Sequence, residues 1–141
     1  MRDVAAAQVE RIRSFIMSVP MFTSLDLYEQ TKLAEAMREV VYNAGDVILQ
    51  QGESGDSMFW IEEGVAQAQK YEPDGQVTVM DHGPGDCFGE LSLLNDSVRA
   101  ANVIALSQVH CWSIDRKSFT NLLGSLKDIL EQSSARYESP G

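Results

Sequence analysis

The sequence predicts a mainly β domain, a closed double-sheet roll with helices flanking it. Short apolar runs rich in β-branched residues recur at near-regular spacing through the middle of the chain, and turn-forming residues separate them. Both ends instead carry apolar residues at helical spacing. The predicted strand runs are residues 40–42, 47–49, 58–61, 65–71, 76–81, 101–106 and 109–114.

The N-terminal segment predicts two helices joined by an apolar turn. Over residues 4–19 the apolar side chains recur every three or four positions, and Pro20 disfavours a helical conformation at the residue before it, which ends the helix. Asp26 can cap a second helix, with Glu29 in the reciprocal position of a capping box. We therefore expect residues 1–38 to form an N-terminal helical unit.

Turn-forming clusters divide the strands. Residues 43–46 read Asn-Ala-Gly-Asp, and residues 51–56 read Gln-Gly-Glu-Ser-Gly-Asp. Pro-Asp-Gly at residues 73–75 predicts the turn of a β-hairpin. We therefore expect the roll to span residues 39–115.

The C-terminal segment returns to helical spacing. Asp115 can cap a helix over residues 116–123, which Gly124 can end, and Ser125 can begin another helix. We therefore expect residues 116–139 to be helical.

Composition limits the classes of partner. The 141 residues suit one domain, and a net charge of −10 repels nucleic acid and anionic membranes. No stretch approaches the ~18 consecutive apolar residues of a membrane span, and no signal peptide is visible. Cys87 and Cys111 are expected to be buried thiols in a reducing compartment, which predicts a cytoplasmic protein.

Side chains suited to catalysis are scarce. His82 and His110 stand far apart, without the spacing of a metal site, so a metal-dependent cupin, which needs a cluster of His ligands, is disfavoured. No Ser–His–Asp or paired-carboxylate arrangement stands out. We therefore expect a regulatory domain without enzymatic activity and without a metal.

One segment has the composition of an anion site. Three glycines lie within residues 83–89, so the backbone there can turn tightly, and one helical turn over residues 91–94 follows. Arg99 offers a planar fork of donors that can grip two phosphate oxygens, and Glu90 offers an acceptor for a sugar hydroxyl. On spacing alone, a turn with a helical cap and a surface salt bridge explains these residues equally well.

Residues 88–94 read Phe-Gly-Glu-Leu-Ser-Leu-Leu, and residues 99–101 read Arg-Ala-Ala. This order resembles the phosphate-binding cassette of cyclic nucleotide-binding domains, whose pattern is Phe-Gly-Glu-Leu-Ala-Leu, a few variable residues, then Pro-Arg-Ala-Ala-Thr. The chain departs from that pattern at Ser92, Val98 and Asn102, where the family has Ala, Pro, and Thr or Ser.

The resemblance implies a role for each cassette residue. Glu90 would accept the ribose 2′-hydroxyl, Arg99 would bind the exocyclic oxygens of the cyclic phosphate, and backbone amides near Leu91, Ser92 and Ala100 would complete the anion cradle. The register of the C-terminal helices places Tyr137 near the base-stacking Tyr of the second nucleotide domain of kinase regulatory subunits. The expected ligand-binding residues are Gly89, Glu90, Leu91, Ser92, Arg99, Ala100, Ala101 and Tyr137.

The resemblance extends over nearly the whole chain. It is greatest to the second, C-terminal domain of cAMP-dependent protein kinase regulatory subunits, with the helical unit over residues 1–38 included. It implies an eight-stranded jelly roll over residues 39–115, with the cassette and its short helix within residues 88–102. The helices of residues 116–139 would then act as a lid.

The resemblance also implies a ligand and partners. Cyclic GMP-dependent kinases carry Thr or Ser directly after the phosphate-binding Arg, whereas this chain has Ala100, which favours cAMP over cGMP. The expected protein partners are a protein kinase catalytic subunit or domain and a tandem second nucleotide domain. The alternative is a non-binding or nucleoside-binding interaction module of the same fold.

Overall fold

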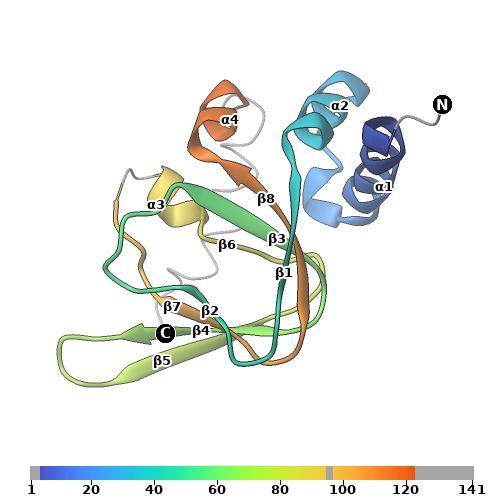
Figure 1. The fold of residues 1–141 in the computed structure, drawn as a ribbon. Helices are drawn as coiled ribbons and strands as arrows, with labels where there is room; N and C mark the ends of the chain where they lie inside the picture. Colours follow the sequence, from blue (N-terminus) through green and yellow to red (C-terminus); the bar gives the residue numbers. More distant parts are fainter. Residues whose placement is uncertain (1–3, 95–96, 123–141) are drawn as a thin grey trace. The chain divides into compact units, whose positions relative to one another are not determined.

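In the part of the chain that the structure describes, eight strands form two antiparallel sheets of four strands each (Figure 1). The computed structural model describes residues 4–94 and 97–122. The predicted fold class, mainly β with flanking helices, is confirmed. The strands are β1 (Arg38–Tyr42), β2 (Val47–Leu49), β3 (Ser57–Glu63), β4 (Ala66–Tyr71), β5 (Val77–His82), β6 (Cys87–Phe88), β7 (Asn102–Ala105) and β8 (Val109–Asp115).

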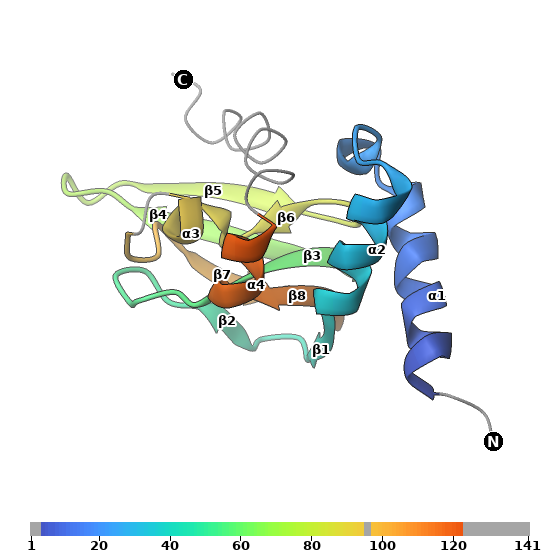
Figure 2. The ribbon, with the colours of Figure 1, turned by 90° about the horizontal axis from the view of Figure 1, so that it is seen from above.

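The two sheets interleave along the chain. One has the strand order β1-β8-β3-β6 and the other β2-β7-β4-β5, so every neighbouring pair except β4 and β5 joins strands that are not consecutive in the sequence. The hairpin of β4 and β5, which turns at residues 72–76, projects past the neighbouring strands in both ribbon views (Figures 1 and 2). β6 is the strand that alternation of apolar and polar residues did not predict, because two residues are too few to show a period.

The core of the roll lies between the two sheets. Strand side chains alternate between two faces, so every second residue of each strand points toward the core. Phe59 of β3 stacks on Phe88 of β6, with ring centroids 5.2 Å apart. The buried core residues are Leu49, Phe59, Ile61, Ala66, Phe88, Val103, Ala105, Val109 and Cys111.

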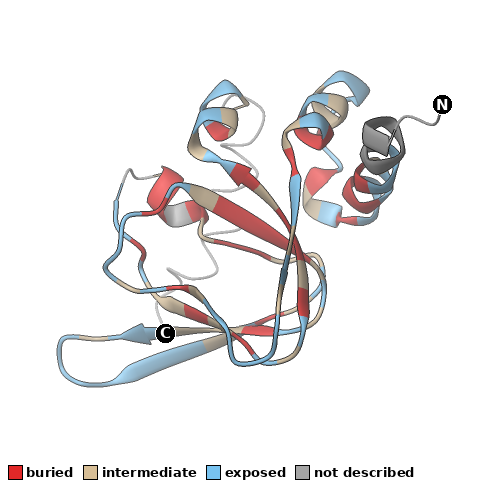
Figure 3. Cartoon of the chain, viewed as in Figure 1, coloured by how far each residue is buried: buried red, intermediate tan, exposed pale blue. Residues whose placement is uncertain are grey.

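Consecutive residues of β3 and β8 are buried, and Figure 3 shows most of β3 coloured as buried. Trp60 and Trp112, which alternate with the core positions, pair across the two strands and are each 0% exposed. Cys87 and Cys111 are buried thiols outside any disulfide, as expected, and burial raises the pKa of Cys111 to about 12.

The described residues 4–37 and 117–122 belong to a second compact unit, and they are mostly helical. Its elements are α1 (Val4–Ser18), the 3₁₀ helix η1 (Pro20–Phe22), α2 (Leu27–Ala36) and α4 (Arg116–Asn121), whose first residue still belongs to the roll unit. The apolar turn predicted between the first two helices is therefore a 3₁₀ helix. None of the described helices is long and apolar enough to cross a membrane.

The predicted capping box at the start of α2 is present. The Glu29 N–H donates to the Asp26 carboxylate at 2.8 Å, and the Asp26 N–H donates to the Glu29 carboxylate at 2.9 Å. These two bonds satisfy donors that a helix start otherwise leaves open. The helix predicted to begin at Ser125 lies outside the described residues.

Candidate ligand-binding site

Two opposite charges are buried in the predicted cassette. Glu90 begins the short helix α3 (Glu90–Leu94) and is 1% exposed, while Arg99, which precedes β7, is 6% exposed. The structure shows no ion pair between them within residues 4–94 and 97–122. A surface salt bridge is therefore the wrong interpretation of these residues, and their burial needs another explanation.

The guanidinium of Arg99 is held by neutral oxygens. Its Nη1 donates to the Gly89 carbonyl at 2.9 Å and to the Ser92 hydroxyl at 2.8 Å. The Ser92 hydroxyl in turn donates to the Gly89 carbonyl at 3.2 Å. Gly89 has φ +85°, a left-handed conformation that favours glycine, so the tight turn into α3 depends on this residue.

The backbone of Arg99 is fixed by strand-like pairing with the segment that follows β2. The Arg99 N–H donates to the Glu53 carbonyl at 2.8 Å, and the Gly52 N–H donates to the Arg99 carbonyl at 2.9 Å. The side-chain carbonyl of Asn102 accepts from the Gln51 N–H at 2.8 Å. Asn102, one of the three departures from the family pattern, thus has a structural role of its own.

Gly55 lies against the guanidinium of Arg99. A Cβ at Gly55 would lie 2.5 Å from Arg99 Cζ, Arg99 Nε and Ser92 Oγ, so a side chain there would displace the guanidinium. Sequence reasoning placed Gly55 in a turn cluster but missed this contact. No local pattern could indicate the contact, because it joins residues 44 positions apart in the sequence.

Burial dominates the electrostatics of Arg99. Desolvation lowers the pKa of Arg99, and the nearby Asp56 carboxylate partly opposes that effect. A guanidinium nevertheless stays charged at neutral pH. The Asp56 side chain is 89% exposed and lies 3.9 Å from Arg116 Nε, so it does not neutralise Arg99 in a direct pair. The site therefore holds a buried positive charge whose hydrogen-bond acceptors are neutral.

Glu90 has an unused acceptor. Its Oε1 is buried and has no hydrogen-bond partner in the described part of the chain. Burial raises the pKa of Glu90 to about 7, although a hydrogen bond to its own backbone and the charge of Arg99 act in the other direction. A buried oxygen without a donor costs free energy, on the order of 1–3 kcal/mol, unless a hydroxyl reaches it.

The other predicted site residues are placed as follows. Leu91 and Ser92 lie in α3, where the Ser92 carbonyl accepts from the Ser97 N–H at 3.0 Å. Ala100 is exposed and Ala101 is half-buried, directly after Arg99. The structure thus brings Gly89, Ser92 and Arg99 into contact. Tyr137 lies outside the described residues.

A second polar cluster lies on the sheet of β1, β8 and β3. Nε2 of His110 contacts the Glu39 carboxylate, and its Nδ1 lies 3.0 Å from Glu62 Oε1. Trp112 Nε1 donates to the same Glu62 oxygen at 3.0 Å. Sequence reasoning missed this cluster, because its members come from three strands that are neighbours only in the folded sheet.

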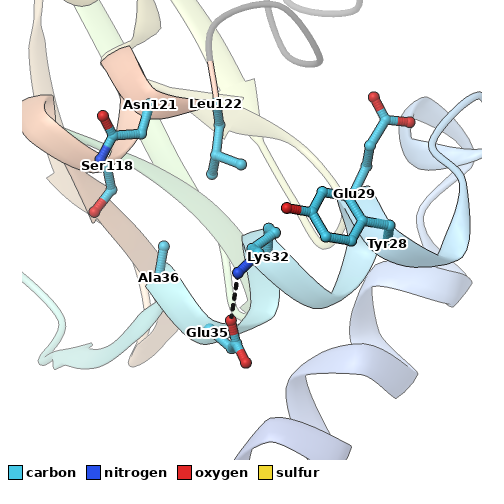
Figure 4. Close-up of a pocket in the computed structure, with 8 residues that line it drawn as sticks. All are labelled: Tyr28, Glu29, Lys32, Glu35, Ala36, Ser118, Asn121 and Leu122. Atoms are coloured by element: carbon cyan, nitrogen blue, oxygen red, sulfur yellow. Dashed lines mark ion pairs between the residues drawn. The ribbon is translucent and has the colours of Figure 1, made fainter.

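The helical unit contains a pocket of about 490 Å³ between α2 and α4 (Figure 4). An ion pair of Lys32 and Glu35, 3.9 Å apart, crosses part of it, and both side chains are about half exposed. No cassette residue lines this pocket. Its lining residues are Tyr28, Glu29, Lys32, Glu35, Ala36, Ser118, Asn121 and Leu122.

Comparison with known proteins identifies one family. Residues 39–125 match the family model described as "Cyclic nucleotide-binding domain". A cAMP-dependent protein kinase regulatory subunit of Mucor circinelloides f. lusitanicus is 40% identical over 125 residues, which cover 89% of this chain and 29% of that protein. The chain thus spans less than a third of that relative's length.

Two solved structures share the fold and much of the sequence. The regulatory domain of Toxoplasma gondii PKA with cAMP is 37% identical with a TM-score of 0.89, covering 97% of this chain and 53% of that one. A structure described as Sp-2Cl-cAMPS bound to PKAR CBD2 is 33% identical with a TM-score of 0.82, covering 96% of this chain and 90% of that one.

Proposed function

This chain belongs to the family of cyclic nucleotide-binding domains, of the type found in regulatory subunits of cAMP-dependent protein kinase, and we propose that it binds cAMP in the cassette of residues 88–102. The relatives are regulatory subunits, which supports a regulatory and not a catalytic role.

The observation that carries the proposal is a pair of buried polar groups in the cassette, Arg99 and Glu90, whose hydrogen-bonding capacity the described residues leave partly unused. Arg99 is buried with only neutral hydrogen-bond acceptors, and Glu90 is buried with one oxygen that accepts no hydrogen bond from the described residues. A cyclic nucleotide offers the two missing groups, an anionic phosphodiester and a ribose hydroxyl. Both charges would be stabilised by the same ligand.

We assign the ligand groups accordingly. Arg99 binds the exocyclic phosphate oxygens, and Glu90 accepts the ribose 2′-hydroxyl. Backbone groups of Gly89, Leu91, Ser92, Ala100 and Ala101 surround the phosphate. Tyr137 stacks on the base and acts as a lid.

The base preference rests on the residue after Arg99. Ala100 offers no hydroxyl for the guanine amino group, so we propose that cAMP binds more tightly than cGMP. A T. gondii relative with the same fold has been solved with cAMP, which supports this choice.

We further propose that ligand binding is relayed to a protein kinase catalytic subunit or domain. Phosphate binding would draw the cassette inward and repack Leu93, which is 6% exposed, together with the half-buried Leu94. The ligand shifts this equilibrium only by its difference in affinity for the two conformations. The curated relatives are much longer than this chain, and a tandem nucleotide domain in the whole protein belongs to the same proposal.

Thermal unfolding with and without ligands tests the binding proposal. A ligand at ~1,000 times its Kd adds about 4 kcal/mol of stability, which for a chain of this length raises the Tm by on the order of 10 °C. We expect cAMP to raise the Tm more than cGMP at equal concentration, and inosine, which lacks the phosphate, to leave it unchanged. The shift with cAMP should be smaller for Tyr137→Ala, because stacking contributes about 1 kcal/mol.

The alternatives have distinct outcomes in the same experiment. A non-binding interaction module shows no shift with any of the three compounds. A nucleoside-binding module shows a shift with inosine that equals or exceeds the shift with cAMP. Either result contradicts the proposed function.

A further inference from the structure

We propose that Ser92 and Gly55 are positioning residues that fix the guanidinium of Arg99 before the ligand arrives, so that one edge of it, formed by Nε and Nη2, is left for the phosphate. This inference deepens the proposed function and rests on it. It concerns a hydroxyl that the family pattern lacks, since the family has Ala where this chain has Ser92.

The hydrogen bonds of Arg99 account for the choice of edge. Nη1 carries two protons, and two acceptors take them: the Gly89 carbonyl at 2.9 Å and the Ser92 hydroxyl at 2.8 Å. The Ser92 hydroxyl donates its own hydrogen bond to the Gly89 carbonyl at 3.2 Å, so Arg99, Ser92 and Gly89 are all bonded to one another. All of the guanidinium's hydrogen bonds to described residues therefore come from Nη1.

The remaining edge has the geometry that a phosphate needs. Nε and Nη2 point their protons in parallel from one side of the planar group, and such an edge can grip two phosphate oxygens at once. With Nη1 occupied, the phosphate does not have to displace Ser92. The hydroxyl is thus able to stay in place when the ligand binds.

The guanidinium of Arg99 also packs against Gly55, which leaves room for it because it has no side chain. A Cβ there would lie 2.5 Å from both Cζ and Nε of Arg99, which is closer than any real Cβ contact. The φ of Gly55 lies outside the left-handed region, so the backbone does not demand glycine and only the packing does.

The peptide that carries Gly55 is itself anchored. Nη2 of Arg116 donates to the Gly55 carbonyl at 2.8 Å, and the Arg116 N–H donates to the Asp56 carbonyl at 2.7 Å. The surface on which the guanidinium lies is therefore fixed by Arg116, which directly follows β8, and not by the loop alone.

Fixing the guanidinium in advance should raise affinity. Arg loses much rotamer freedom when it is immobilised, and a site that has already ordered its side chains loses less on binding. The bond from a charged Nη1 to the Ser92 oxygen is of the stronger, charge-assisted kind.

The ligand-free protein tests the positioning directly. In protein labelled with ¹⁵N-arginine, NMR measures rotation of the Arg99 guanidinium about its Cζ–N bonds, with Arg99→Lys identifying the signals. We expect slow rotation in the wild type and faster rotation in Ser92→Ala. Equal rotation rates in the two proteins would overturn the inference. This readout needs no ligand, so it stands even if the chain binds no cAMP and the proposed function fails.

Titration with cAMP tests the consequence. We expect Ser92→Ala to bind cAMP about fivefold more weakly, because the variant has to order the Arg99 side chain on binding, whereas the wild type has ordered it beforehand. Affinity that is unchanged, or tighter because the hydroxyl competes with the phosphate, would contradict the inference.

A matched pair of glycine variants separates packing from backbone effects. Gly55→Ala should lose more affinity than Ser92→Ala, because its Cβ displaces the guanidinium. Gly83→Ala is the control: its φ is also outside the left-handed region, and an added Cβ meets nothing within 4 Å, so it should bind as the wild type does. Wild-type affinity in Gly55→Ala would overturn the inference. If Gly55→Ala does not fold, the guanidinium rotation and the cAMP affinity of Ser92→Ala still test the inference.

Discussion

The carboxyl group of Glu90 is buried in the cassette. Its exposed fraction is 1%, and burial raises its pKa from 4.5 to about 7. Between these pH values the folded chain binds a proton at Glu90 that the unfolded chain has released. The free energy of unfolding therefore falls as pH rises through this window, by on the order of 3 kcal/mol for this one group.

The variant Glu90→Gln removes that titration. We expect the stability of the variant relative to the wild type to increase as pH rises from 5 to 8, because only the wild type acquires a buried negative charge. Urea unfolding of both proteins at each pH measures the difference, in which the other titrating groups cancel. A difference that stays constant with pH would show that Glu90 does not titrate in this range.

At the scale of elements, α2 depends on its first turn. Asp26 and Glu29 satisfy two donors reciprocally, at 2.8 and 2.9 Å. Replacing Asp26 with Ala removes one acceptor and should cost about 1 kcal/mol, or a decrease in Tm of about 3 °C for a chain of this length. Circular dichroism during thermal unfolding measures the decrease in Tm.

A second acidic residue provides the control for charge. Glu63 is exposed at the end of β3, and Glu63→Ala removes the same charge from a chain of net charge −10 without touching a cap. Its Tm should stay close to that of the wild type. Equal losses in the two variants would assign the effect of Asp26→Ala to charge and not to capping.

The elements also show what local sequence can predict. The start of α2 was readable because Asp26 and Glu29 stand three residues apart. The cassette was readable because the order of residues 88–94 and 99–101 resembles the family pattern. β6 was not predicted from the sequence, because its two residues, Cys87 and Phe88, are too short a segment to show alternation.

At the scale of the whole molecule, the unpredicted features depend on contacts between distant segments. Gly55 and Arg99 meet only because the segment after β2 pairs with the segment before β7. Glu39, Glu62 and His110 meet because β1, β8 and β3 are neighbours in one sheet. The residue order of the cassette led to the predicted site residues, Gly89 and Ser92 among them, whereas the contact of Gly55 with Arg99 required the fold.

The central claim is that a buried arginine binds a cyclic phosphate, and calorimetric titration of cAMP into the wild type and Arg99→Lys tests it most directly. Lys keeps the charge but cannot form the two-pronged contact. We expect saturable binding at one site in the wild type and a loss of at least about tenfold in affinity in Arg99→Lys, with both proteins folded. Equal affinity in the two proteins, or no heat of binding in the wild type, would contradict the account.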